Sequence, residues 1–159
     1  MRKSIVFLFM LIALSESCPL VWAESASNLE LTIQTNQISV KVRDIFAVTT
    51  TIQNVSKSVQ TLHIYTCSND VFWTTDNPKV GIVGPSCEKN VIREIKLKPN
   101  ESRKNRLALA IDLAPDNSSI EVPSSISLRL GFTNNGDNPE HGTIAEPIWS
   151  NSITLKIVK

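Results

Sequence analysis

Apolar and polar side chains alternate with a period of two along most of the chain after residue 28. A strand with one buried face places every second side chain in the core, so this alternation predicts strands. Apolar residues at helical spacing are absent from every window of useful length, and we therefore expect an all-β fold. The alternating sets are Leu29, Leu31 and Ile33; Val40 and Val42; Phe46, Val48, Thr50 and Ile52; Leu62 and Ile64; Ile95 and Leu97; Leu107, Leu109 and Ile111; Ile126, Leu128, Leu130 and Phe132; and Ile153, Leu155 and Ile157.

Turn-forming sequences separate these runs, at residues 54–56, 98–101, 114–117 and 134–137. Seven to nine short strands, each with one buried face, favour an antiparallel two-sheet β-sandwich. The immunoglobulin-like type agrees best with the length and the number of strands, and a closed barrel is the alternative.

Residues 1–23 have the order of a cleaved signal peptide. Arg2 and Lys3 precede an apolar run at 4–14, and Ala23 closes a small-residue cleavage site. The run is shorter than the roughly 20 residues that a membrane-spanning helix needs. Lipidation at Cys18 is the alternative, but a charged residue stands just before it where a lipoprotein needs small apolar ones. We expect cleavage after Ala23, export to the periplasm or the outside of the cell, and no stable membrane anchor.

Removing 23 of 159 residues leaves 136, the size of one domain. We expect a flexible N-terminus over 24–28 and a single β-sandwich domain over 29–159. The whole chain has 16 basic and 15 acidic residues, and the leader contains Arg2, Lys3 and Glu16, so 14 of each sign remain. The resulting zero net charge, without basic runs, argues against binding to nucleic acid or to a membrane surface.

The expected mature chain keeps two cysteines, Cys67 and Cys87. In an exported protein an even pair predicts a disulfide. The separation differs from Cys-x-x-Cys, and no further Cys or His ligand lies nearby, so a redox or zinc pair is the weaker alternative. Closing this loop is expected to stabilise the fold by roughly 3 kcal/mol.

Two segments break the alternation, and we expect any binding surface to lie on them. The first runs from Cys67 to Cys87 and the second from Thr133 to Asn151. Loops on a rigid sandwich commonly bind partners. For both Trp73 and Trp149, however, a buried core position is preferred over an exposed binding platform, since a Trp beside a disulfide is a common packing pair in sandwiches. The candidate binding residues are Trp73, Asp76, Asp137, Glu140, His141 and Trp149.

No catalytic, cofactor or metal motif is evident in the sequence. His63 stands on an outward strand position, where a solvated or hydrogen-bonded histidine is expected. Glu140 and His141 form the one acid/base pair that a small hydrolase would use, but no nucleophile motif accompanies it. Residues 134–140 carry oxygen ligands for calcium without the spacing of a dedicated loop, so a hairpin turn is preferred. Three Asn-x-Ser matches, at 54–56, 100–102 and 117–119, are as many as this composition gives by chance.

Part of the chain resembles known exported domains. A strand is followed by Asn54-Val55-Ser56-Lys57-Ser58-Val59, then by a Trp-bearing middle, and then by Ile95-Lys96-Leu97-Lys98-Pro99-Asn100-Glu101. This arrangement resembles small bacterial Ig-like export domains and is similar to the BsuPI family of proteinase inhibitors. The resemblance covers under half of the chain, and it implies an Ig-like fold and an inhibitory activity.

Together these features predict an exported, non-enzymatic protein-interaction module without a cofactor, whose protein partner the sequence does not identify. A proteinase inhibitor that presents a surface loop is the alternative.

Overall fold

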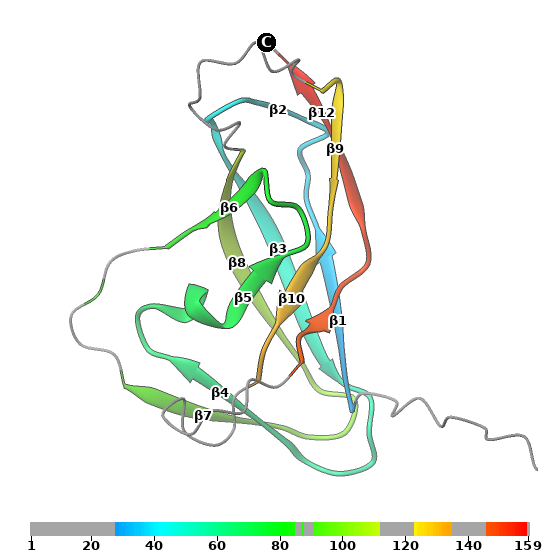
Figure 1. Cartoon of the computed structure of the whole chain (residues 1–159). Coiled ribbons are helices and arrows are strands. Elements are labelled where there is room, and N and C mark those ends of the chain that lie inside the picture. The colour runs from blue at the N-terminus through cyan, green and yellow to red at the C-terminus, as the bar shows by residue number, and fades with distance from the viewer. Residues whose placement is uncertain (1–27, 85–86, 88–90, 112–122, 135–145, 159) are drawn as a thin grey trace, which may run out of the picture.

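The computed structural model describes residues 28–84, 87, 91–111, 123–134 and 146–158 (Figure 1). The expected signal peptide lies outside these residues. The described chain contains twelve strands and one 3-10 helix, η1. Their bounds are β1 Leu29–Gln34, β2 Ser39–Lys41, β3 Ile45–Asn54, β4 Gln60–Tyr65, η1 Asn69–Phe72, β5 Trp73–Thr75, β6 Val80–Val83, β7 Ile92–Leu97, β8 Ser102–Ile111, β9 Ser125–Leu128, β10 Leu130–Phe132, β11 Ile148–Trp149 and β12 Ile153–Val158.

The first sheet has the strand order β1-β3-β8-β6, and every neighbouring pair in it is antiparallel. Strands β3 and β8 lie at its centre, and each is ten residues long. Buried and accessible positions alternate along β3, and they alternate in β8 from Leu107 to Ile111. Their register places Val48 opposite Leu107 and Phe46 opposite Leu109, so both strands turn their apolar faces to the same side.

The second layer, called the second sheet below, consists of two three-stranded sheets, β11-β10-β5 and β2-β12-β9, which follow one another along two interrupted strands. β9 and β10 follow one another with a break at Arg129, and β11 and β12 with a break at residues 150–152. β10 pairs with β5 and β11, whereas β12 pairs with β9 and, in parallel, with β2. The chain therefore crosses from the first sheet to the second between β1 and β2.

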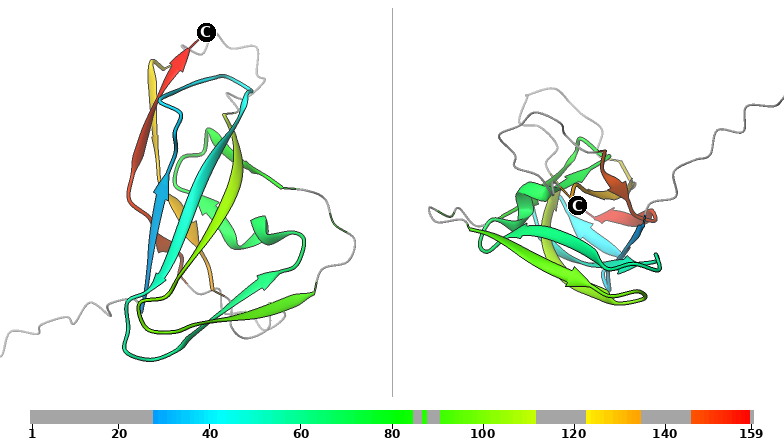
Figure 2. Two further views of the ribbon diagram at one scale, coloured as in Figure 1. Left: turned by 180° about the vertical axis from the view of Figure 1, so that it is seen from behind. Right: turned by 90° about the horizontal axis from the view of Figure 1, so that it is seen from below.

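This connectivity is that of an immunoglobulin-like β-sandwich. The order β1-β3-β8-β6 corresponds to strands A, B, E and D, and the order of β5, β9–β10 and β11–β12 corresponds to C, F and G. The predicted fold class is confirmed, with one difference, since the β2–β12 pair is parallel. Figure 2 shows the two layers from behind and from below.

Strands β4 and β7 form a separate two-stranded ribbon at one end of the sandwich (Figure 2). Leu62 and Leu97 are buried on one face of the ribbon and join it to the core. Asn54 fixes its base, because the amide nitrogen of this fully buried side chain donates to the carbonyls of Ser58 and Leu97, at 2.7 and 2.9 Å.

The core confirms most of the predicted alternation. The apolar sets of β1, β3, β8 and β9–β10 are all buried. Val42 differs, because β2 ends at Lys41 and Arg43 adopts a positive φ of 69° in the turn to β3. The structure also has more strands than the seven to nine predicted. Three short strands, β5, β6 and β11, lie in the segments without alternation.

Among the described residues, no helix has both the length and the hydropathy needed to cross a membrane.

Candidate functional site

The two tryptophans among the candidate binding residues have different environments in the structure. Trp73 opens β5, is 9% exposed, and its ring centroid lies 5.0 Å from that of Phe132. This burial agrees with the core interpretation of Trp73. Trp149 in β11 is 39% exposed, so the preferred buried-core interpretation is wrong for this residue.

Cys67 and Cys87 form the predicted disulfide, with their Cα atoms 6.0 Å apart. The enclosed segment contains η1, β5 and β6, so most of it is regular structure that enters the core through Phe72 and Trp73. The length of the segment between the two cysteines is therefore explained by the strands and core side chains that it contributes.

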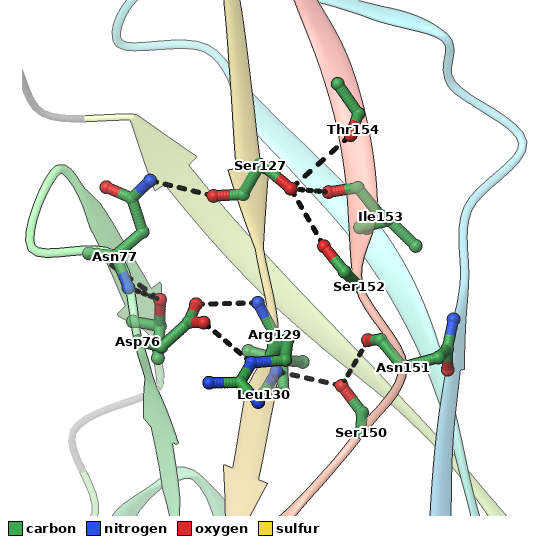
Figure 3. Close-up of polar contacts among 11 residues, drawn as sticks. Asp76, Asn77, Ser127, Arg129, Leu130, Ser150, Asn151, Ser152, Ile153 and Thr154 are labelled. Atoms are coloured by element: carbon green, nitrogen blue, oxygen red, sulfur yellow. Dashed lines mark hydrogen bonds and ion pairs between the residues drawn. The ribbon is translucent and has the colours of Figure 1, made fainter.

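Asp76 and Arg129 form an ion pair at the break between β9 and β10 (Figure 3). One carboxylate oxygen of Asp76 accepts from the backbone N–H of Arg129 at 2.7 Å, and the other accepts from its Nε at 2.8 Å. Partial burial on its own would raise the pKa of Asp76. The hydrogen bonds and the charge of Arg129 outweigh that effect, and they hold the pKa below its ordinary value.

Arg129 connects this ion pair to Trp149. Its guanidinium carbon lies 5.3 Å from the centroid of the Trp149 ring, within the range of a cation–π contact. The indole also packs closely against β10 at Gly131. A Cβ at Gly131 would lie 2.9 Å from Pro147 and from Thr74 and 3.1 Å from the indole, so only glycine fits at this position without displacing its neighbours. Trp149 is thus held in one place while part of it stays accessible.

An open groove of about 670 Å³ lies beside Trp149, where β1 and β11 come together. Val55, which is 47% exposed, contributes an apolar side chain to it, and Glu30 and Glu146 contribute carboxylates. The groove is lined by Leu29, Glu30, Leu31, Val55, Glu146, Pro147, Ile148 and Trp149. We call these residues, with Asp76 and Arg129, the Trp149 surface.

Neighbouring polar contacts keep the interrupted strands in register (Figure 3). The buried Ser150 hydroxyl accepts from the backbone N–H of Leu130 at 3.0 Å, and Asn77 Nδ2 donates to the carbonyl of Ser127 at 2.8 Å. Asn151 hydrogen-bonds to both the N–H and the C=O of Ile33, so it closes the outer edge of β1 at that residue. These contacts support the Trp149 surface from β1, from the turn after β5 and from the break between β11 and β12.

His63 is less solvated than the sequence predicted. Its side chain is 16% exposed, its Nε2 lies 3.6 Å from Glu94, and its buried Nδ1 has no hydrogen-bond partner among the described residues. The Asn134 amide bonds to the N–H of His63 and to the C=O of Thr61, which places the segment after β10 against β4.

Asp137, Glu140 and His141 lie outside the described residues, and so do residues 135–140 of the segment that was considered for calcium. Asn134, the first residue of that segment, holds β4 through the two hydrogen bonds just described. Within the described ranges, no group of three or more Asp, Glu, His or Cys side chains is placed to hold a metal ion.

Sequence reasoning missed Arg129 and Val55. Arg129 is the one charged residue at the outward positions of 125–132, and Val55 is an apolar residue inside a polar turn. Both were visible as exceptions to a local pattern. Their proximity to Trp149 depends on strand pairing, which the pattern does not define.

No protein-family model matches the sequence, and no curated protein matches it. Among solved structures, the chain is similar to a β-glucosidase from Listeria innocua in complex with glucose, with 13% identity and a TM-score of 0.40. The alignment covers 83% of this chain and 16% of the enzyme. A mutant of that enzyme in complex with laminaribiose gives 13% identity and a TM-score of 0.41, over 84% and 16% of the two chains. This chain therefore spans about one sixth of the length of the proteins that it resembles.

Proposed function

We propose that this chain is an exported, non-enzymatic β-sandwich that binds another protein through the Trp149 surface. The observation that supports it is the fixed and partly exposed Trp149, held by Gly131 and Arg129. Tryptophan and arginine are the residues most enriched among those that dominate binding energies, and a side chain that is already ordered loses little entropy on binding. The Cys67–Cys87 disulfide supports export, since such bonds persist in oxidising compartments.

The chemistry of the groove favours a particular kind of partner. Val55, Pro147 and Trp149 offer apolar contact, and Glu30 and Glu146 offer negative charge beside it. A complementary segment carries an apolar side chain and a nearby lysine or arginine. The carboxylates would contribute mainly to orientation and to the rate of association, and this contribution decreases as salt increases.

Capture from the exported fraction tests the proposal with two matched variants. Val55→Asp places a charge in the groove, whereas Ile38→Asp makes the same kind of change at a side chain that is 78% exposed elsewhere. Both positions are exposed, so we expect both variants to unfold at nearly the wild-type temperature. A partner of the Trp149 surface is captured by wild type and Ile38→Asp and is lost with Val55→Asp.

Two results would contradict this proposal. Equal capture by all three proteins would remove the Trp149 surface as the binding site. Strong inhibition of a co-exported protease by the wild type, unchanged in Val55→Asp, would favour the proteinase-inhibitor alternative.

A further inference from the structure

Strand β7 has an edge that faces away from its partner strand. On β4, the N–H of His63 and the C=O of Thr61 bond to Asn134, so they point away from β7. The pair His63–Glu94 is consequently a non-hydrogen-bonded pair of the antiparallel ladder, and the backbone groups of Glu94 also point away from β4.

Backbone N–H and C=O groups point to alternate sides along a strand, so those of Ile92 and Lys96 also point away from β4. The N–H and C=O groups of Ile92, Glu94 and Lys96 have no hydrogen-bond partner within the part of the chain that the structure describes, and all three residues are exposed. The edge ends at Lys98, whose N–H donates to the Glu101 carboxylate at 2.8 Å and whose C=O accepts from the Glu101 N–H at 2.9 Å. The open edge therefore covers residues 92–96.

We propose that β7 pairs in antiparallel fashion with β7 of a second copy of this chain, with Ile95 on the two-fold axis. A symmetric dimer brings the same edge of both copies together. In this register Glu94 lies opposite Lys96 of the second copy, and their outward N–H and C=O groups form the ladder. The surface shares no residue with the Trp149 surface, so this inference is independent of the proposed function.

Charge selects this register over its neighbours. A two-fold axis at Glu94 places two carboxylates opposite each other, and an axis at Lys96 places two ammonium groups opposite each other. Like charges in directly opposed positions destabilise a strand pair. Only the axis at Ile95 places Glu94 of each copy opposite Lys96 of the other copy. It also places the two Ile95 side chains opposite each other, on the face of the paired strands that Glu94 and Lys96 do not occupy.

The geometry also limits the assembly to two copies. Pairing through β7 produces a four-stranded sheet whose outer strands are the two copies of β4. The outer edge of β4 is already bonded to Asn134 at Thr61 and His63, so it does not accept a further strand there. We expect a closed dimer and no fibre.

Sedimentation equilibrium of the disulfide-bonded protein over a range of concentrations tests the pairing. The wild type is expected to dimerise reversibly, and weakly because a single short strand pair buries little area. Glu94→Lys and Lys96→Glu each place like charges across the axis, and each is expected to be monomeric at concentrations where the wild type is a dimer. Lys57→Glu, in the turn before β4, changes the net charge as Lys96→Glu does and is expected to keep the wild-type association.

The two single variants can also be combined. In an equimolar mixture of Glu94→Lys and Lys96→Glu, every opposed pair again joins opposite charges, so a mixed dimer is expected although neither variant dimerises alone. The double variant Glu94→Lys with Lys96→Glu exchanges the two charges and is expected to recover the dimer.

The outcome that overturns this inference is a wild type that stays monomeric throughout the concentration range. Dimerisation that survives in both single variants, or a mixture that stays monomeric, would equally remove β7 as the interface. Thermal unfolding of each variant separates these outcomes from loss of folding, because Glu94→Lys also removes the contact with His63.

Discussion

Single polar side chains decide how the loops of this protein are held, and Asn54 is the clearest case. It is fully buried, its Nδ2 donates to two carbonyls, and its Oδ1 accepts from the N–H and the hydroxyl of Ser56. The Asn-Val-Ser match at 54–56 is therefore a structural turn. Because its nitrogen is buried and both of its hydrogens are bonded, Asn54 cannot accept a glycan in the folded protein.

Asn54→Ala is expected to lower the free energy of unfolding by roughly 2–4 kcal/mol. The substitution leaves the buried Leu97 carbonyl and the Ser56 N–H without their partner, and each unsatisfied buried group costs about 1–3 kcal/mol. Urea unfolding followed by tryptophan fluorescence measures the change. Asn77→Ala is the control, because its bond to Ser127 is exposed and its loss costs about 1 kcal/mol. Equal effects of the two substitutions would contradict the special role of Asn54.

At the scale of elements, side chains complete strands where backbone pairing stops. Asn151 serves the edge of β1, Asn134 serves the edge of β4, and Asp76 occupies the break between β9 and β10. Each provides hydrogen-bond partners that a neighbouring strand would otherwise provide. Such side chains protect an edge from pairing with other chains.

The Asp76–Arg129 pair makes stability depend on pH in a defined direction. Because the pKa of Asp76 is lower in the folded chain than its ordinary 3.8, the folded state favours the carboxylate. The stabilisation is fully present above the unfolded pKa and disappears as the pH falls through the folded pKa. Its size is expected to be below about 1 kcal/mol, since the Arg129 side chain is 47% exposed.

Urea unfolding of wild type and Asp76→Asn tests this dependence. The wild type is expected to be the more stable near neutral pH, and the difference is expected to shrink well below pH 3.8. A difference that grows on acidification would have the wrong sign for this ion pair.

At the scale of the whole molecule, the disulfide closes the segment that contains η1, β5 and β6 and that connects β4 to β7. The double variant Cys67→Ser with Cys87→Ser is expected to lower the free energy of unfolding by about 2–5 kcal/mol. Unfolding in the presence and absence of a reductant provides the measurement. The wild type is expected to lose a similar amount on reduction, while the double variant is unaffected. A wild type insensitive to the reductant would show that the bond contributes little.

Local pattern alone determined the fold class, most of the buried positions and the disulfide. Period-two alternation is a property of a strand with one buried face, so β3, β8 and β9–β10 could be recognised without knowing their neighbours. The disulfide could also be predicted, because only Cys67 and Cys87 remain once Cys18 of the expected signal peptide is set aside.

Only the tertiary structure decided which surfaces those strands create. Asp76 and Trp149 stand 73 positions apart in the sequence, and they meet through Arg129 because β5 and β11 both pair with β10. The short strands β5, β6 and β11 have too few residues to show a period, so their pairing did not follow from the sequence. The open edge of β7 is likewise a consequence of register, which strand pairing sets and the sequence of one strand does not contain.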